Sequence, residues 1–198
     1  MNKGRLEAFS DGVFAIIITI IVLLFDLPKG SHLSDLKEMI PLFLVYLVSF
    51  FIIGTHWANH HHLMQVAKKV NGKIIWANHL YLFTMSFCPL VTGWAGRSGF
   101  DEIPTITYVI TMLLESISYI ILQKMIVNSH DCVELKRVVD ESKKEAVTIA
   151  LELAALICAF IAPVRWLTYI LLVAKSALWV IPDLRMSKMF EEKSNNND

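Results

Sequence analysis

The sequence has few cysteines and no excess of charge of either sign. Three cysteines are spread over 198 residues, and their positions do not indicate a disulfide framework. Lysine and arginine together number 18, as do aspartate and glutamate, so the formal net charge is zero and nothing favours a nucleic-acid partner. Apolar side chains, in contrast, make up 55 % of the chain, and the mean hydropathy is +0.53. This composition predicts a membrane protein.

Long apolar runs alternate with short polar segments, and a helix that crosses a bilayer needs about 20 residues. The pattern predicts an all-α integral membrane protein, with a six-helix domain at residues 1–182 and a polar cytoplasmic tail at 183–198. The expected spans are about residues 9–27, 40–58, 74–94, 104–127, 146–162 and 164–181. The first apolar run lacks a small-residue cleavage site, which predicts a retained helix and not a removed signal peptide.

Positive charges are divided unevenly between the two sides of the expected bundle. Six spans place both termini on one side, and that side carries most of the lysines and arginines, including many in the polar segment 128–145. The opposite side carries Lys29, Lys37, Arg97 and Arg165. Because positive residues collect on the cytoplasmic side of a membrane, both termini are expected in the cytoplasm and the protein in the cell membrane.

A compact polar cluster opens the first span. Arg5-Leu6-Glu7-Ala8-Phe9-Ser10-Asp11-Gly12 precedes an apolar run from Val13 to Phe25 that is interrupted by Thr19. Asp11 stands where the helix would enter hydrocarbon, and a carboxylate there is costly unless a partner or water satisfies it. The cluster supports two interpretations: a first transmembrane helix with a polar N-terminal turn, or a pore-lining helix with Arg5 and Asp11 in a buried polar network.

The polar cluster resembles the R-x-x-x-F-S-D-G signature of the transmembrane protein 175 family of potassium channels, with all five fixed positions present. Trp57-Ala58-Asn59-His60-His61 is similar to the tryptophan and histidine motif that ends the family's second helix. The signature occurs once, as in the single-repeat, bacterial-type members. The resemblance implies a homotetramer in the lipid bilayer that passively conducts potassium and other monovalent cations through a central pore. It implies no enzyme activity and no cofactor other than the permeant K⁺.

The resemblance also assigns roles along the first helix, which would line the pore. Ile16 is expected to form a hydrophobic gate and Thr19 a ring of hydroxyls that contacts K⁺ transiently, while Ile20 and Leu23 continue the lining on the same helix face. The Thr19 hydroxyl could also bond back to a carbonyl one turn earlier. The sequence has no Thr-Val-Gly-Tyr-Gly stretch, so a modest preference for potassium over sodium is expected.

A structural network that holds the pore helix is implied at the cytoplasmic end. Carried over to this sequence, it comprises Arg5, Phe9, Ser10, Asp11, Trp57 and His60. Whether His60, His61 or His62 takes part stays open, and tryptophan and histidine could also serve as headgroup anchors. A rival interpretation is a histidine-box metal enzyme that uses His56, His60 and His61, but no second box is present.

Three charged residues fall well inside the expected spans, away from their ends: Glu115 in the fourth, Glu152 in the fifth and Lys175 in the sixth. Charges at such depth usually pair. Glu152–Lys175 is the first expected pair and Glu115–Lys175 the second, because the fifth and sixth spans are tightly linked. The three residues indicate contacts that hold helices together, or alternatively a proton- or ion-coupled membrane transporter.

Overall fold

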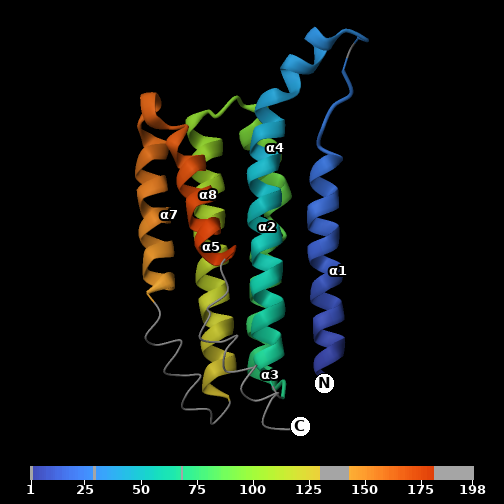
Figure 1. The fold of residues 1–198 in the computed structure, drawn as a ribbon, viewed down its shortest axis with the longest axis vertical. Coiled ribbons are helices and arrows are strands. Elements are labelled where there is room, and N and C mark those ends of the chain that lie inside the picture. Colours follow the sequence, from blue (N-terminus) through green and yellow to red (C-terminus); the bar gives the residue numbers. More distant parts are fainter. Residues whose placement is uncertain (1, 29, 68, 130–142, 181–198) are drawn as a thin grey trace.

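The computed structural model describes residues 2–28, 30–67, 69–129 and 143–180, which form an elongated bundle of helices (Figure 1). The polar tail expected at 183–198 lies outside the described residues. So do most of the polar segment 128–145 and the last residue of the expected sixth span. The other expected spans lie within the described residues.

The helices are α1 (Lys3–Val22), α2 (Ile40–Val66), α3 (Gly72–Met85), α4 (Cys88–Arg97), α5 (Glu102–Asn128), α7 (Lys144–Phe160) and α8 (Leu167–Val180), with short 3-10 helices η1 (Leu33–Met39) and η2 (Ala162–Val164). Three stretches are long and apolar enough to cross a membrane: Leu33–Gln65, Gly72–Arg97 and Glu102–Asn128. In the described residues, α1, α2, the α3–α4 pair, α5, α7 and α8 take the places of the six expected spans.

α1 begins and ends several residues before the limits expected for the first span. The Asn2 side chain accepts a hydrogen bond from the Gly4 amide at 3.1 Å, so the helix starts before the polar cluster and includes it. After Val22 the chain turns away from the helix. The Leu24 carbonyl accepts a hydrogen bond of 2.6 Å from the Arg97 guanidinium, which satisfies a backbone group exposed by the helix end.

The expected third span is divided into two helices. α3 ends at Met85, and α4 begins at Cys88 with Pro89 in its first turn. Proline is tolerated in a first turn but would remove a hydrogen bond and clash inside a continuous helix, which accounts for the break. α2, in contrast, continues beyond residue 58 to Val66, so the histidines belong to the helix and not to a connection.

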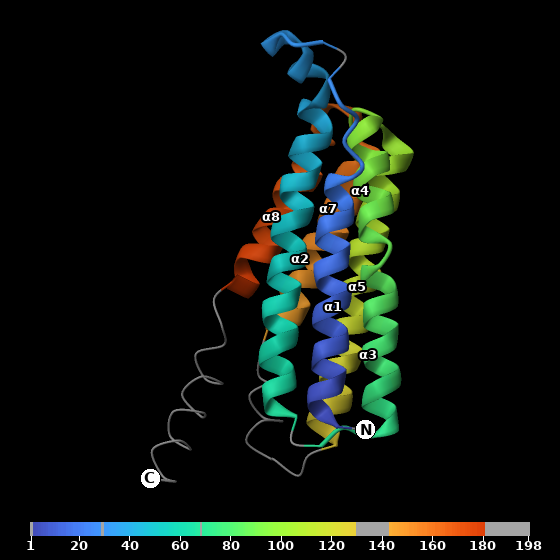
Figure 2. The same cartoon turned by 90° about the vertical axis from the view of Figure 1, so that its right-hand side faces the viewer.

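α1 lies at the edge of the bundle beside α2 (Figure 1), and the turned view shows it between α2 and α3 (Figure 2). α5 lies deeper and packs against α3, α4 and α7. The start of α1 and the α2–α3 connection lie at one end of the bundle, and η1 stands at the other (Figure 2). α1 is therefore placed where another subunit could reach it.

Gly96 allows α4 to approach α2 closely. A Cβ atom at Gly96 would lie 2.6 Å from the Leu42 Cα atom, whereas a Cβ atom at Gly54 would meet nothing within 4 Å. We expect Gly96→Ala to lower the free energy of unfolding by about 1–3 kcal/mol, because backbone must move. Gly54→Ala, the matched control within α2, should be neutral or stabilising by up to about 1 kcal/mol. Thermal unfolding in detergent compares the two, and equal melting temperatures would contradict this close approach.

Candidate functional site

α1 has one face covered by the rest of the chain and one face that is not. The covered face is apolar apart from Ser10, and its buried residues are Leu6, Ser10, Phe14, Ile17 and Ile21. On the opposite face the exposed fraction is 57 % for Ile16, 40 % for Ile20 and 80 % for Leu23. Thr19 is exposed on this face as well. The four residues expected to line a pore thus share a mainly apolar surface that their own chain leaves open.

The Thr19 hydroxyl bonds back within α1. Its Oγ1 lies 2.9 Å from the Ala15 carbonyl oxygen and 3.0 Å from that of Ile16, and it donates to this pair. The back-bond considered from the sequence is therefore formed. A hydroxyl has two lone pairs besides its single proton, so this bond leaves the oxygen able to face a cation.

Two hydrogen-bonded connections tie the N-terminal half of α1 to its neighbours. The Trp57 indole on α2 donates to Asp11 Oδ1 at 2.9 Å. Separately, His60 Nε2 donates to Asn78 Oδ1 at 2.7 Å, and Asn78 Nδ2 donates to Ser10 Oγ at 3.0 Å. The second connection is buried and joins α1, α2 and α3. The expected network residues Ser10, Asp11, Trp57 and His60 thus make polar contacts between helices.

Asn78 was not singled out from the sequence as a network residue. Its amide side chain within an apolar span was a usable signal, because buried amides need hydrogen-bond partners. Two expected network residues do not join these bonds. Arg5 is exposed, and Phe9 is 53 % exposed with its ring stacked on His79 at a centroid distance of 5.7 Å.

The histidines of α2 differ in burial and in partners. His60 is buried, whereas His61 and His62 are exposed, so the geometry favours His60 for the network. His56 Nδ1 lies 2.9 Å from the Tyr81 hydroxyl. Among the described residues, no group of three or more His, Cys, Asp or Glu side chains is arranged to hold a metal ion.

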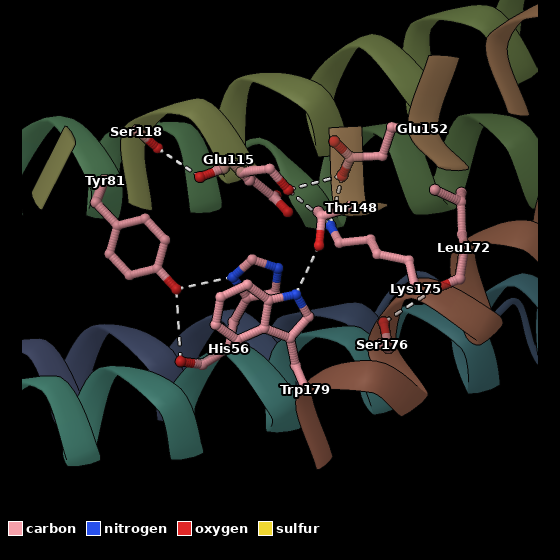
Figure 3. A network of polar contacts seen from close by, with 11 residues as sticks. His56, Tyr81, Glu115, Ser118, Thr148, Glu152, Leu172, Lys175, Ser176 and Trp179 are labelled. Atoms are coloured by element: carbon pink, nitrogen blue, oxygen red, sulfur yellow. Dashed lines mark hydrogen bonds and ion pairs between the residues drawn. The ribbon is translucent and has the colours of Figure 1, made fainter. Parts of the chain in front are cut away.

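The predicted Glu152–Lys175 ion pair is confirmed. Lys175 Nζ lies 2.6 Å from Glu152 Oε1, and both side chains are buried (Figure 3). Ser116 on α5 donates to the same carboxylate oxygen at 2.7 Å and accepts from Lys175 at 2.9 Å. The pair therefore connects α5, α7 and α8. Glu115 makes no ion pair or hydrogen bond through its carboxyl group within the described part, so the second expected pair is not formed.

Comparison with known proteins decides the family. A potassium channel of Chryseobacterium sp. (strain P1-3) is 42 % identical over 193 residues, which cover 97 % of this chain and 100 % of that protein. The family model described as endosomal/lysosomal potassium channel TMEM175 matches residues 5–89, which include the polar cluster and the tryptophan and histidine motif. The chain belongs to the TMEM175 family. It is thus a member of a family of ion channels and not an enzyme.

Other TMEM175 proteins extend the comparison. The crystal structure of a lysosomal potassium-selective channel TMEM175 homolog from Chamaesiphon minutus superposes with a TM-score of 0.78 at 26 % identity, covering 91 % of this chain and 97 % of that one. The human endosomal/lysosomal proton channel TMEM175 is 32 % identical over 130 residues, which cover 57 % of this chain and 25 % of that protein. The shared fold and the apolar helices show a multi-pass membrane protein.

Proposed function

We propose that this protein conducts potassium passively through a central pore formed by the α1 helices of four copies. The observation that carries the proposal is the open face of α1, where Ile16, Thr19, Ile20 and Leu23 lie uncovered by their own chain. The relatives named as potassium channels support the choice of ion.

The single pore helix of each chain and the single-repeat resemblance to the TMEM175 family favour four copies. One helix cannot enclose an aqueous path, and homo-oligomers close by rotational symmetry. Because α1 lies at the edge of the bundle, its open face can meet the α1 helices of neighbouring copies without rearrangement of the core (Figure 2).

The proposed gate is the ring of Ile16 side chains. Apolar rings gate by closing or by excluding water, and hydroxyl rings offer weak oxygen ligands. Thr19 is three residues further along α1, about 4.5 Å along the axis, so an ion leaving the Ile16 ring would next meet hydroxyl oxygens. Weak ligands of this kind give a modest preference for potassium over sodium.

The orientation of the chain in the cell membrane is proposed from its charges. Lys3 and Arg5 at the start of α1 lie at the same end of the bundle as Lys69 in the α2–α3 connection and Lys73 in the first turn of α3 (Figure 2). Positive residues of short connections favour the cytoplasm. Both chain termini and the Asp11–Trp57 contact are then on the cytoplasmic side.

The function is tested by potassium flux into liposomes that hold the purified protein, with a potassium gradient and a proton ionophore to remove the opposing potential. We expect flux that persists when sodium is replaced by an impermeant cation and that needs no second substrate. Protein-free liposomes are the control. Flux that saturates and requires a co-transported substrate would instead indicate the coupled transporter.

A further inference from the structure

Each subunit encloses a second polar site, formed by α5, α7 and α8 and separate from the open face of α1 (Figure 3). It contains two carboxylates and one ammonium group: Glu115, Glu152 and Lys175. Lys175 and Glu152 neutralise each other at 2.6 Å. Glu115 is the unmatched group, because its side chain has no exposed surface and neither carboxyl oxygen has a hydrogen-bond partner among the described residues.

An ionised carboxylate without a partner is strongly disfavoured in a protein interior, and uptake of a proton removes its charge. We propose that Glu115 is a proton-binding residue: it holds a proton in this structure, and when it loses that proton its carboxylate competes with Glu152 for Lys175. The site goes beyond the proposed pore and takes one ligand, a proton.

The surroundings of Glu115 supply one cation for two carboxyl groups. The titratable side chains that face it or the ion pair are His56 on α2, Tyr81 on α3, Cys88 on α4, Tyr108 on α5, Glu152 on α7 and Lys175 on α8. Of these, Lys175 is the group that carries a positive charge at neutral pH, and Glu152 already contacts it. A proton on Glu115 therefore balances the charge of the cluster.

A small cavity reaches the cluster at Ser116 and Lys175. Its volume is about 20 Å³, and Ser116 and Lys175 line it together with His56, Asn59 and Glu145. This volume is large enough for a single water molecule, and the Ser116 and Lys175 side chains at its wall offer polar partners. Glu145 lies in the first turn of α7, so the cavity extends from the ion pair towards the start of that helix. A water molecule bound there would lie between the cluster and the start of α7.

In this arrangement Glu115 can replace Glu152 as the counterion of Lys175. In this structure Lys175 pairs closely with Glu152 and not with Glu115. In Glu152→Gln the ammonium group loses its partner, so Glu115 releases its proton and takes the place of Glu152. The effects of replacing the two glutamates are then strongly non-additive, as expected for groups that share one partner.

Infrared spectroscopy of the purified protein in lipid tests the proton directly. We expect a carboxylic-acid carbonyl band at neutral pH that is lost in Glu115→Gln and also in Glu152→Gln. The matched control is Glu102→Gln on the same helix, whose carboxylate is exposed and lies 2.8 Å from Arg165; this variant should keep the band. A band that survives in Glu115→Gln, or no band in the unmodified protein, would overturn the proposal.

Thermal unfolding of the same variants provides a second test that does not depend on conduction, so its outcome is separate from that of the proposed potassium channel. We expect Glu115→Gln to keep the melting temperature, because the amide resembles the protonated acid. The double replacement should lower the melting temperature by more than the sum of the two single changes. If Glu115 were already an ionised partner of Lys175, Glu115→Gln alone would be as damaging as Glu152→Gln, and the proposal would fail.

Discussion

Replacing Ile16 by asparagine is expected to raise the potassium current and to weaken the preference for potassium over sodium. Ile16 is 57 % exposed on the open face of α1, where four copies would form an apolar ring. An asparagine ring admits water and offers amide oxygens to either ion, which lowers the barrier that the apolar ring presents. Every 1.4 kcal/mol removed from that barrier corresponds to about a tenfold increase in rate. Liposome flux and the reversal potential in mixed potassium and sodium solutions measure the two effects.

Ile157→Asn on α7 is the matched control for this experiment. Ile157 is 63 % exposed in the single chain, so the same amide is introduced on an open apolar surface away from α1. Its current and ion preference should equal those of the unmodified protein. An Ile16→Asn channel with unchanged current and selectivity would show that Ile16 is not at the constriction.

Lys175→Met is expected to cause the largest loss of stability, about 3–5 kcal/mol, because it leaves Glu152 as a buried carboxylate without a counterion. The residual hydrogen bond from Ser116 to Glu152 at 2.7 Å satisfies one oxygen but does not neutralise the charge. Fluorescence-detected size-exclusion chromatography after heating gives the melting temperature and shows whether assembled protein survives.

The double variant Lys175→Met with Glu152→Gln serves as its control. It removes both charges, keeps an acceptor for Ser116, and should recover most of the stability lost in the single variant, because neutral replacement of a buried pair is often tolerated. The double variant should also conduct potassium like the unmodified protein. Loss of transport from a well-folded double variant would favour the coupled transporter over the channel.

The Glu152–Lys175 pair and the helical placement of the polar cluster could be predicted from the sequence. Charges inside apolar spans are rare and need partners, so two of opposite sign on adjacent helices suggest each other. Glu115 shows where this logic stops. The tight link between the fifth and sixth spans favoured Glu152 as the first partner of Lys175, but whether Lys175 also reaches Glu115 or leaves it without a partner could not be predicted. That choice depends on side-chain packing, which gives Glu152 the 2.6 Å contact and leaves Glu115 without one.

The helix limits were less predictable for a related reason. Apolar content marks where a chain prefers lipid, whereas a helix ends where its backbone hydrogen bonds end. α2 therefore continues through the histidines to Val66, and α1 stops at Val22 although Leu23 to Phe25 are apolar. The amide of Asn78 indicated a need for partners, but which partners it would find was not predictable, because Ser10 and His60 come from two other helices.

The attachments of α1 decide how the proposed gate can move. Asn78 on α3 holds the helix near its beginning through Ser10, and Arg97 at the end of α4 holds the carbonyl of Leu24 just beyond its last turn. Ile16 lies between these two points, so α1 is held on both sides of the proposed gate and does not pivot about a single attachment. In the proposed channel a wider pore would require α2, α3 and α4 to move with α1, because Trp57 on α2 also holds α1 through Asp11.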